Sequence, residues 1–273
     1  MKLIQSRDNP FFKELVKLAG SARHRSKEKL TLLDGIHLLA AYLDSGMQPQ
    51  HVLLNATALR DEELAALLPR VGDVPVTQLD GKLFAELSEL KMPTGILALI
   101  ALPRPDMPIA QSRFALLLED IQDPGNLGSI LRSAAAAGCD AVFLSRGCAD
   151  AWSPKVLRAA MGGHFAIHIY ERQDLPEVAK IFCEQSLRGL PAYPSAGVLL
   201  AASLHASHSL YDCDLRGAVA FLIGNEGAGL SGDLLRIATQ TITIPMPGKV
   251  ESLNAAAATA ICLFEAVRQR QGQ

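Results

Sequence analysis

Short apolar runs alternate with amphipathic segments along most of this chain, which predicts strands separated by helices. In the first part of the chain, "TLLDGIHLLAAYLDSG" and "DEELAALLPRVG" have helical periodicity, whereas "HVLLN", "VPVTQL" and "GILALIAL" are typical of strands. Further on, the expected strands are 114–118, 141–144, 165–170, 198–202, 219–223 and 241–244. Short apolar strands between helices favour a largely parallel, covered sheet, so we predict the α/β class.

A proline-rich stretch divides this pattern in two. The segment "PRPDMP", residues 103–108, interrupts both helix and strand hydrogen bonding. A chain of 273 residues can bury one or two cores. We therefore expect two domains, one over residues 1–104 and one over residues 112–273.

Composition excludes several classes of protein. No N-terminal stretch has the pattern of a secretion signal, and no apolar run is long enough to span a bilayer, so we expect a cytoplasmic protein that stays out of membranes. The five cysteines form no Cys-x-x-Cys pair and are expected to be reduced. The pairs His164/His168 and His205/His208 have no further ligands nearby in sequence, so no metal site is predicted.

Positive charge is concentrated at the N-terminus. Residues 1–30 contain eight Lys and Arg against three Asp and Glu, although the formal net charge of the whole chain is -2. The candidate nucleic-acid-binding side chains are Arg23, Arg25, Lys27 and Lys29. Such a cluster attracts backbone phosphates whatever the base sequence, but it can equally be a solvated helix face.

The segment "DPGNLGSILRSAAAAG", residues 123–138, follows an apolar strand and turns through two glycines into a helix. Such a junction presents backbone N–H groups to a ligand. The spacing Gly125-x-x-Gly128 lacks the dinucleotide-binding fingerprint, and Arg146 stands where a ribose-binding carboxylate would end the next strand. No Gly-Lys-Ser/Thr follows, so the junction is not an ordinary nucleotide-binding loop.

Two further loops of unusual composition follow later strands, "FLIGNEGAGLS" and "IPMPGKVESLNAAAATA". Because ligands bind beyond the carboxyl ends of parallel strands, we expect the three loops to line one pocket. Taken singly, Asn126, Ser252 and Arg132 also fit simpler roles as a turn residue, a helix cap and a surface ion-pair partner.

In these three loops the sequence resembles the SpoU-type, TrmH-like RNA ribose 2′-O-methyltransferases of the SPOUT superfamily. The family motifs are matched in order by "NLGSILRSAAAAG", "IGNEGAGLS" and "IPMPGKVESLNAAAATAICLFEAV". More loosely, "SRDNPFFKELVKLAGSARHRSKEKLTLLDGIHLLAAYL" is similar to the small ribosomal-protein-like α/β domain that often binds the RNA substrate in front of the catalytic domain.

The resemblance implies a C-terminal trefoil knot, S-adenosyl-L-methionine as the cofactor, and a homodimer. The implied cofactor-binding residues are Gly224, Ile244, Met246 and Leu253. The residues implied near the reacting ribose are Asn126, Arg132, Glu226, Ser252 and Asn254. The sequence departs from the family at Ala202 and Ala256, where a threonine and a serine are common.

The implied reaction is methyl transfer to a ribose 2′-hydroxyl of structured RNA, with ribosomal RNA as the favoured substrate. Family proposals make Arg132 the base, but a guanidinium is always protonated, so we interpret Arg132 as a phosphate anchor and oxyanion stabiliser. Three alternatives stay open at this point: a transfer RNA substrate, methylation of a base, and a catalytically silent RNA-binding module.

Overall fold

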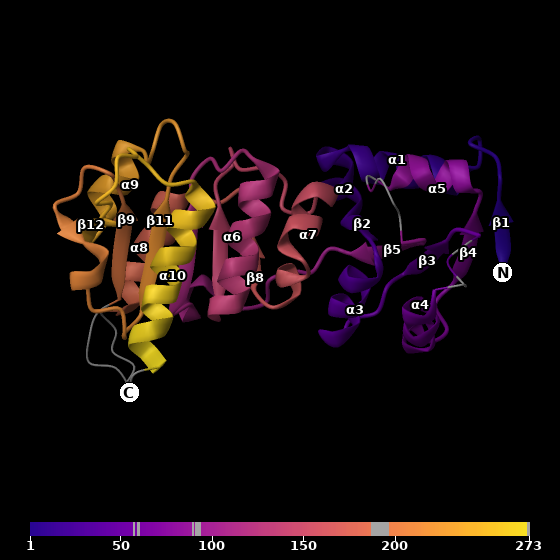
Figure 1. Ribbon diagram of the computed structural model, residues 1–273, viewed down its shortest axis with the longest axis horizontal. Coiled ribbons are helices and arrows are strands. Elements are labelled where there is room, and N and C mark those ends of the chain that lie inside the picture. The colour runs from indigo at the N-terminus through magenta and orange to yellow at the C-terminus, as the bar shows by residue number, and fades with distance from the viewer. Residues whose placement is uncertain (57, 59–60, 89, 91–93, 187–196, 272–273) are drawn as a thin grey trace. The chain divides into compact units, whose positions relative to one another are not determined.

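The computed structural model describes residues 1–56, 58, 61–88, 90, 94–186 and 197–271, and the chain divides into two compact units (Figure 1). The first unit comprises Met1–Pro103 together with Asp150–Phe165, and the second comprises Arg104–Ala149 and Ala166–Gln273. Both units combine helices with a sheet, which confirms the two-domain α/β prediction. The assignment of RNA binding to 1–104 and of cofactor binding to 112–273 stays a prediction.

The first unit is built on a mixed five-stranded sheet in the order β1-β4-β3-β5-β2. Strand β5 runs antiparallel to β2 and β3, and the other pairs are parallel. Its strands are β1 (Lys2–Ile4), β2 (Leu30–Asp34), β3 (His51–Leu54), β4 (Val76–Leu79) and β5 (Ile96–Ala101). Its helices are α1 (Pro10–Gly20), α2 (Ala22–Glu28), α3 (Ile36–Asp44), α4 (Glu62–Leu67), α5 (Gly81–Leu87) and α7 (Pro154–Ala160).

Helix α1 shows how the sequence builds the core of this unit. The side chain of Asn9 accepts hydrogen bonds from the backbone at the helix start, and Pro10 occupies the first helical position. Phe12, Leu15 and Leu18 are three residues apart and fully buried on one face. The helix therefore covers the sheet with its apolar stripe and leaves its lysines in solvent.

Residues 31–46 differ from the single helix that their periodicity predicts. They form strand β2 and then helix α3, divided by Gly35 at φ +112°. A backbone angle of that sign suits glycine and ends the strand sharply. The run Leu30–Asp34 is a strand because it pairs with β5, a partner that lies far away in sequence.

The second unit is built on a parallel seven-stranded sheet in the order β10-β12-β9-β11-β6-β7-β8. Its strands are β6 (Phe114–Leu118), β7 (Ala141–Leu144), β8 (His168–Tyr170), β9 (Val198–Ala202), β10 (His208–Ser209), β11 (Val219–Ile223) and β12 (Gln240–Thr243). Its helices are α6 (Pro124–Ala137), α8 (Leu175–Ser186), α9 (Gly232–Ile237) and α10 (Ala255–Gln271).

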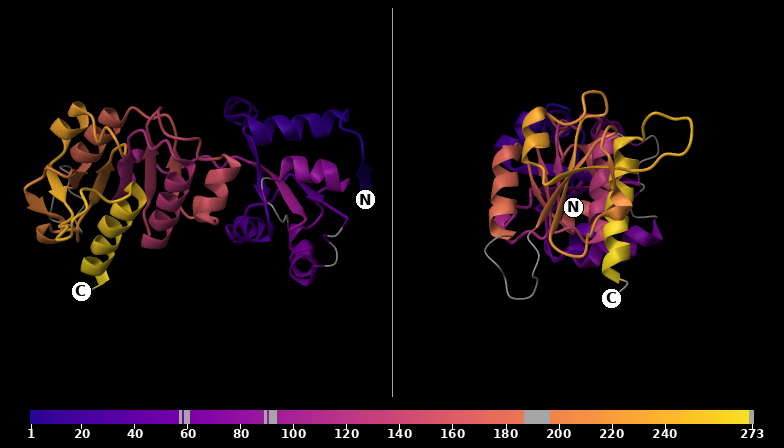
Figure 2. Two further views of the ribbon diagram at one scale, coloured as in Figure 1. Left: turned by 45° about the horizontal axis from the view of Figure 1, so that its top comes forward. Right: turned by 90° about the vertical axis from the view of Figure 1, so that its left-hand side faces the viewer.

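Helices cover both faces of this sheet, as a continuous apolar strand pattern requires. Every residue of β6 and of β11 is buried. Helix α8 lies on one face, and α10 packs along α6 on the other (Figure 2, right). The prediction of a largely parallel, covered sheet is therefore confirmed.

Strand β8 is shorter than predicted. Of the expected strand 165–170 only His168–Tyr170 pairs with β7, because Gly163–Phe165 form a 3-10 turn that belongs to the first unit. The trefoil knot stays a prediction from the resemblance. Among the described residues no helix is both long and apolar enough to cross a membrane.

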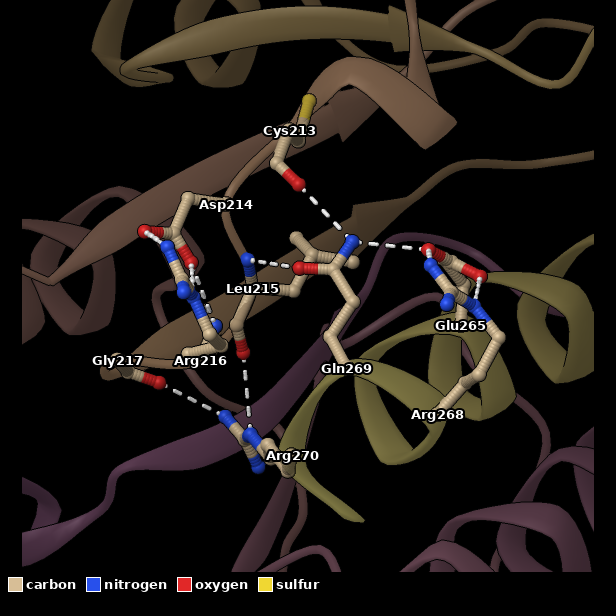
Figure 3. A network of polar contacts seen from close by, with 9 residues as sticks. All are labelled: Cys213, Asp214, Leu215, Arg216, Gly217, Glu265, Arg268, Gln269 and Arg270. Atoms are coloured by element: carbon tan, nitrogen blue, oxygen red, sulfur yellow. Dashed lines mark hydrogen bonds and ion pairs between the residues drawn. The ribbon is translucent and has the colours of Figure 1, made fainter. Parts of the chain in front are cut away.

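The end of α10 is tied to the loop in front of β11 (Figure 3). The side chain of Gln269 accepts a hydrogen bond from the Leu215 backbone at 2.9 Å and donates to the Cys213 carbonyl at 3.0 Å. Arg270 donates to the carbonyls of Leu215 and Gly217 at 3.1 and 2.8 Å. These bonds fix the C-terminal helix against the central strands that carry the candidate site.

Candidate functional site

The three motif loops come together at the carboxyl ends of the strands, as predicted. Strands β6 and β11 pair in register, with Leu118 opposite Ile223, so the loops that follow them start side by side. The backbone N–H of Ser231 donates to the Glu119 carboxylate at 2.6 Å, and the Asn225 side chain donates to the Asp120 carbonyl at 2.9 Å. The first two motif loops therefore hold each other directly.

The second motif loop folds back tightly on itself. Asn225 and Gly229 exchange backbone hydrogen bonds of 3.1 and 2.9 Å, and the Asn225 side chain accepts from the backbone of Gly227 and Ala228. A Cβ atom on Gly224 would lie 2.3 Å from the backbone carbon of Gly229. Position 224 therefore requires glycine because backbone passes where a side chain would stand.

Asp120 has a strained backbone at the start of the first motif loop. Its φ of +54° is unusual for a residue with a side chain. Ser145 holds it there: the Ser145 hydroxyl donates to the Asp120 carboxylate at 2.6 Å and accepts from the Asp120 backbone at 3.0 Å. Sequence reasoning missed this contact, which joins residues from two different strand ends.

Side chains from all three motifs form one hydrogen-bonded chain. The Asn254 amide donates to the side-chain oxygen of Asn126 at 2.9 Å, and the Asn126 amide donates to the Glu226 carboxylate. Asn254 also caps α10, since its side-chain oxygen accepts from the backbone of Ala256 at 2.9 Å. The first motif helix α6 is positioned by its own cap, Asp123, whose carboxylate accepts from the Asn126 backbone at 2.7 Å.

A cavity of about 360 Å³ opens beside this chain between the second and third motif loops. All four residues predicted to bind the cofactor line it, together with Glu226 and Ser252. The predicted site residues that line the cavity are Gly224, Glu226, Ile244, Met246, Ser252 and Leu253. The structure thus brings together the second and third motifs around one space, and at its edge Asn126 meets Glu226 and Asn254 meets Asn126.

Other cavity residues were not predicted. Ser203, Leu204 and His205 directly follow β9 and line the cavity. Their position after a parallel strand next to β11 is the signal that could have found them. A second cavity shares Asn225, Glu226 and Gly227 with the first and is otherwise lined by residues 120–124.

Arg132 lies apart from the cavity. It is exposed on α6, six residues after Asn126 and therefore about 9 Å further along the helix axis. Within the described part of the chain it forms no hydrogen bond or ion pair. Its permanent charge is free for a partner outside this chain.

The four basic residues predicted to bind RNA differ in exposure. Arg23, Lys27 and Lys29 are exposed on or just after α2. Arg25 is only 4% exposed, because its guanidinium is paired with Asp150 and with backbone carbonyls. Burial therefore removes Arg25 from the side chains that we propose for RNA contact.

His164 and His168, one of the pairs considered from the sequence, belong to different units. His164 is buried in the first unit, where its Nε2 hydrogen-bonds the Ala151 carbonyl at 2.6 Å, and burial lowers the pKa of His164 to about 4. His168 belongs to the second unit and lies 3.4 Å from an Asp106 oxygen. His205 lines the cavity, and His208 belongs to β10.

Comparisons with known proteins agree with this geometry. Residues 113–264 match the model of the SpoU rRNA Methylase family, and residues 9–98 match an MRM3-like substrate binding domain. The chain is 33% identical to an uncharacterized tRNA/rRNA methyltransferase of Synechocystis, over 98% of this chain and 94% of that protein. It is 32% identical to the 23S rRNA (guanosine(2553)-2′-O)-methyltransferase RlmP of Bacillus subtilis, over 97% and 98% of the two chains.

A solved structure is similar over almost the whole chain. The SpoU methyltransferase AviRb from Streptomyces viridochromogenes, in complex with AdoMet, superimposes with a TM-score of 0.84 at 28% identity, covering 97% of this chain and all of that one. The parallel sheet, the three loops and these matches define an RNA methyltransferase with a separate substrate-binding unit. The chain belongs to the SpoU rRNA Methylase family.

Proposed function

We propose that this protein transfers the methyl group of S-adenosyl-L-methionine to a ribose 2′-hydroxyl of ribosomal RNA. The observation that carries the proposal is the chain of side chains Asn254–Asn126–Glu226 at the edge of the cavity. Each of the three side chains comes from a different motif. Residues that only stabilised a turn or capped a helix would not need hydrogen bonds to side chains of the other motifs. The family and a relative named as a 23S rRNA 2′-O-methyltransferase support the reaction and the substrate.

The cavity fits the cofactor in size and in lining. Pockets for small molecules hold roughly 300–1,000 Å³, and this one has about 360 Å³. Ile244, Met246 and Leu253 offer apolar contact, and Gly224 leaves backbone exposed toward the space. The AdoMet complex of the Streptomyces relative supports the same ligand. When bound, S-adenosyl-L-methionine supplies an electrophilic methyl group.

The polar side chains at the edge of the cavity would orient the ribose. Glu226 can accept a hydrogen bond from a ribose hydroxyl. Asn126 holds Glu226 in position, and Asn254 holds Asn126. Ser252 lines the same cavity and offers a second hydroxyl contact. Alignment of the 2′-oxygen with the methyl group is the main contribution that the protein must make.

Arg132 would act on the RNA rather than on the cofactor. An exposed guanidinium can grip a phosphate with two donors. In the proposed homodimer it would stabilise the developing alkoxide of RNA held by the partner subunit. It cannot take up the proton, because it is always protonated. We assign the proton to water or to a phosphate oxygen.

The remaining assignments are also proposals. The first unit would bind RNA through Arg23, Lys27 and Lys29, the second would hold the cofactor, and the enzyme would act as a cytoplasmic homodimer. We place the dimer contact on α10, where Phe264 is 47% exposed. Transfer RNA is the second candidate substrate, since the Synechocystis relative is named for both RNAs.

The test uses ribosomal RNA and transfer RNA from a strain that lacks the gene, incubated with purified protein and radiolabelled S-adenosyl-L-methionine. We expect label in ribosomal RNA at a phosphodiester that resists alkali, because a methylated 2′-oxygen cannot attack the adjacent phosphate. Label at a bond that alkali cleaves would indicate a base methyltransferase. Label in transfer RNA alone would favour the second substrate, and cofactor binding without label in any RNA would contradict the proposed activity.

A further inference from the structure

Residues 150–165, here termed the docking segment, belong to the methyltransferase part by sequence but to the first unit by packing. By sequence they lie within residues 113–264, the part that matches the SpoU rRNA Methylase family, but they pack in the first unit. The segment contains α7, which lies against β2, and the 3-10 turn Gly163–Phe165. Its ends continue into the second unit at Ala149 and Ala166, so the chain passes between the units three times.

Arg25 anchors the start of this segment. Its Nε and Nη2 donate to the Asp150 carboxylate at 2.9 and 2.5 Å, and its Nη1 donates to the carbonyls of Leu18 and Ala19 at 2.5 and 2.9 Å. The Arg25 side chain is 5% exposed and that of Asp150 is 20% exposed. A buried charge that loses its partner is strongly destabilising, so this pair must remain formed while the segment stays in place.

Further contacts extend along the segment. The buried Thr31 hydroxyl donates to the Trp152 carbonyl at 2.8 Å. The rings of Tyr42 and Phe165 meet edge to face, with 5.1 Å between their centroids. The segment is therefore held at its start and at its end by side chains of the first unit.

We propose that the docking segment couples the substrate-binding unit to the catalytic unit, and that Arg25 is a positioning residue for RNA methylation rather than an RNA contact. The proposal rests on the proposed function, because it assigns RNA binding to the first unit. With the segment docked, RNA held on the first unit is presented to the second through three chain connections. With the segment released, only the connection after Pro103 remains, and the effective concentration of bound RNA at the site falls.

The test compares three full-length variants. Arg25→Gln and Asp150→Asn each break the anchor, and Arg70→Gln is the matched control, because Arg70 forms an Arg–Asp pair with Asp44 in the same unit but on its exposed surface. We expect the two anchor variants to raise the KM for RNA by about tenfold, with kcat and cofactor Kd within about twofold. The double variant should have the same KM for RNA as either single variant, and Arg70→Gln should have the KM of the parent protein.

The direction in which Asp150→Asn changes the KM for RNA distinguishes the positioning role of Arg25 from direct RNA binding. If Arg25 contacted phosphate, removing the Asp150 charge would free Arg25 and tighten RNA binding, so a lower KM for RNA would overturn the proposal. Salt dependence gives an independent reading. Lys27→Gln should reduce the slope of log affinity against log salt by about one unit, whereas Arg25→Gln should leave it unchanged.

Two further results keep the proposal open to refutation. Thermal unfolding of the cofactor-free variants must show coupling between Arg25 and Asp150 and none between Arg70 and Asp150, and an uncoupled anchor would contradict the docking role. This measurement needs no methylation, so it stands if the parent protein proves inactive and the proposed function fails. An anchor variant that lowers kcat or cofactor affinity as much as it raises the KM for RNA would show general damage and overturn the proposal.

Discussion

The Asn254 side chain donates a hydrogen bond to the Asn126 side chain at 2.9 Å, which joins the start of α10 to the first turn of α6. Because Asn126 in turn donates to Glu226, a change at either asparagine leaves the carboxylate without its fixed orientation. The three motifs are thus one constellation, and their members should respond to mutation as a unit.

Asn126→Ala should lower single-turnover methylation by roughly tenfold to a hundredfold, the effect of losing about 1–3 kcal/mol of positioning. The variant with Asn126→Ala and Asn254→Ala should lose little more, because both changes break the same chain. Ser129→Ala, on the exposed side of α6, is the control and should keep full activity. Losses that multiply in the double variant would mean that the two asparagines act independently.

Arg132→Ala should leave cofactor affinity within a few-fold, because Arg132 lies away from the cavity that we assign to the cofactor. Turnover on RNA should fall by roughly two to three orders of magnitude, the scale for losing one transition-state donor. Arg132→Lys should recover little, since an ammonium lacks the planar pair of donors. Calorimetry with the cofactor and initial rates with RNA make the comparison; full activity of Arg132→Ala would reduce Arg132 to a solvated surface charge.

Gly224→Ala should abolish measurable cofactor binding in a protein that still folds. The added Cβ would lie within 2.5 Å of three backbone atoms at Gly229 and Leu230, so the second motif loop must open. Gly232→Ala is the matched control, because the nearest atom to its Cβ is a flexible Arg236 nitrogen at 3.7 Å. Circular dichroism checks the fold, and calorimetry measures the cofactor affinity. A Gly224→Ala variant that binds the cofactor as tightly as the parent protein would show that the second motif loop accommodates the added Cβ.

Residues 112–273, expressed alone, should bind S-adenosyl-L-methionine with the affinity of the full chain, because every cavity residue lies in the second unit. The docking segment would be left without Arg25, Thr31 and Tyr42, so the piece should melt at a lower temperature and scatter more light. Titration calorimetry and differential scanning fluorimetry provide the two readings. A folded piece that binds no cofactor would contradict the proposed division of labour.

Phe264→Glu should convert the expected homodimer to a monomer, because it puts a charge on an exposed large apolar position of α10. Tyr211→Glu, at a position that is 52% exposed outside that helix, should leave the dimer intact. Sedimentation velocity at micromolar concentration distinguishes the two forms. A parent protein that sediments as a monomer would refute the dimer itself.

Local sequence patterns predicted most strands of the second unit, and the reason is physical. The strands 114–118, 141–144, 198–202 and 219–223 coincide with β6, β7, β9 and β11, because a strand buried on both faces must be apolar throughout. The convergence of the three loops followed from parallel topology. Expected strand 241–244 is shifted by one residue to Gln240–Thr243, within the usual uncertainty of an element's end.

What the sequence did not reveal depends on contacts between distant residues. Arg25 looks like its basic neighbours in a charged helix, and its burial is decided by Asp150, 125 positions further along. The strained Asp120 depends in the same way on Ser145 from the next strand. Neither contact leaves a periodic signal, so a single sequence cannot distinguish Arg25 from Lys27.

The crossing of the docking segment into the first unit limits how this architecture can be recombined. Exchanging residues 1–103 for the substrate-binding unit of another methyltransferase would leave Asp150, Trp152 and Phe165 behind, opposite residues that did not evolve with them. A chimera that aims at a new RNA target must therefore also transplant residues 150–165. Under the proposed division of labour, the residues that determine substrate choice are discontinuous in the gene, so new specificities should arise more readily by point substitution than by exchange of domains.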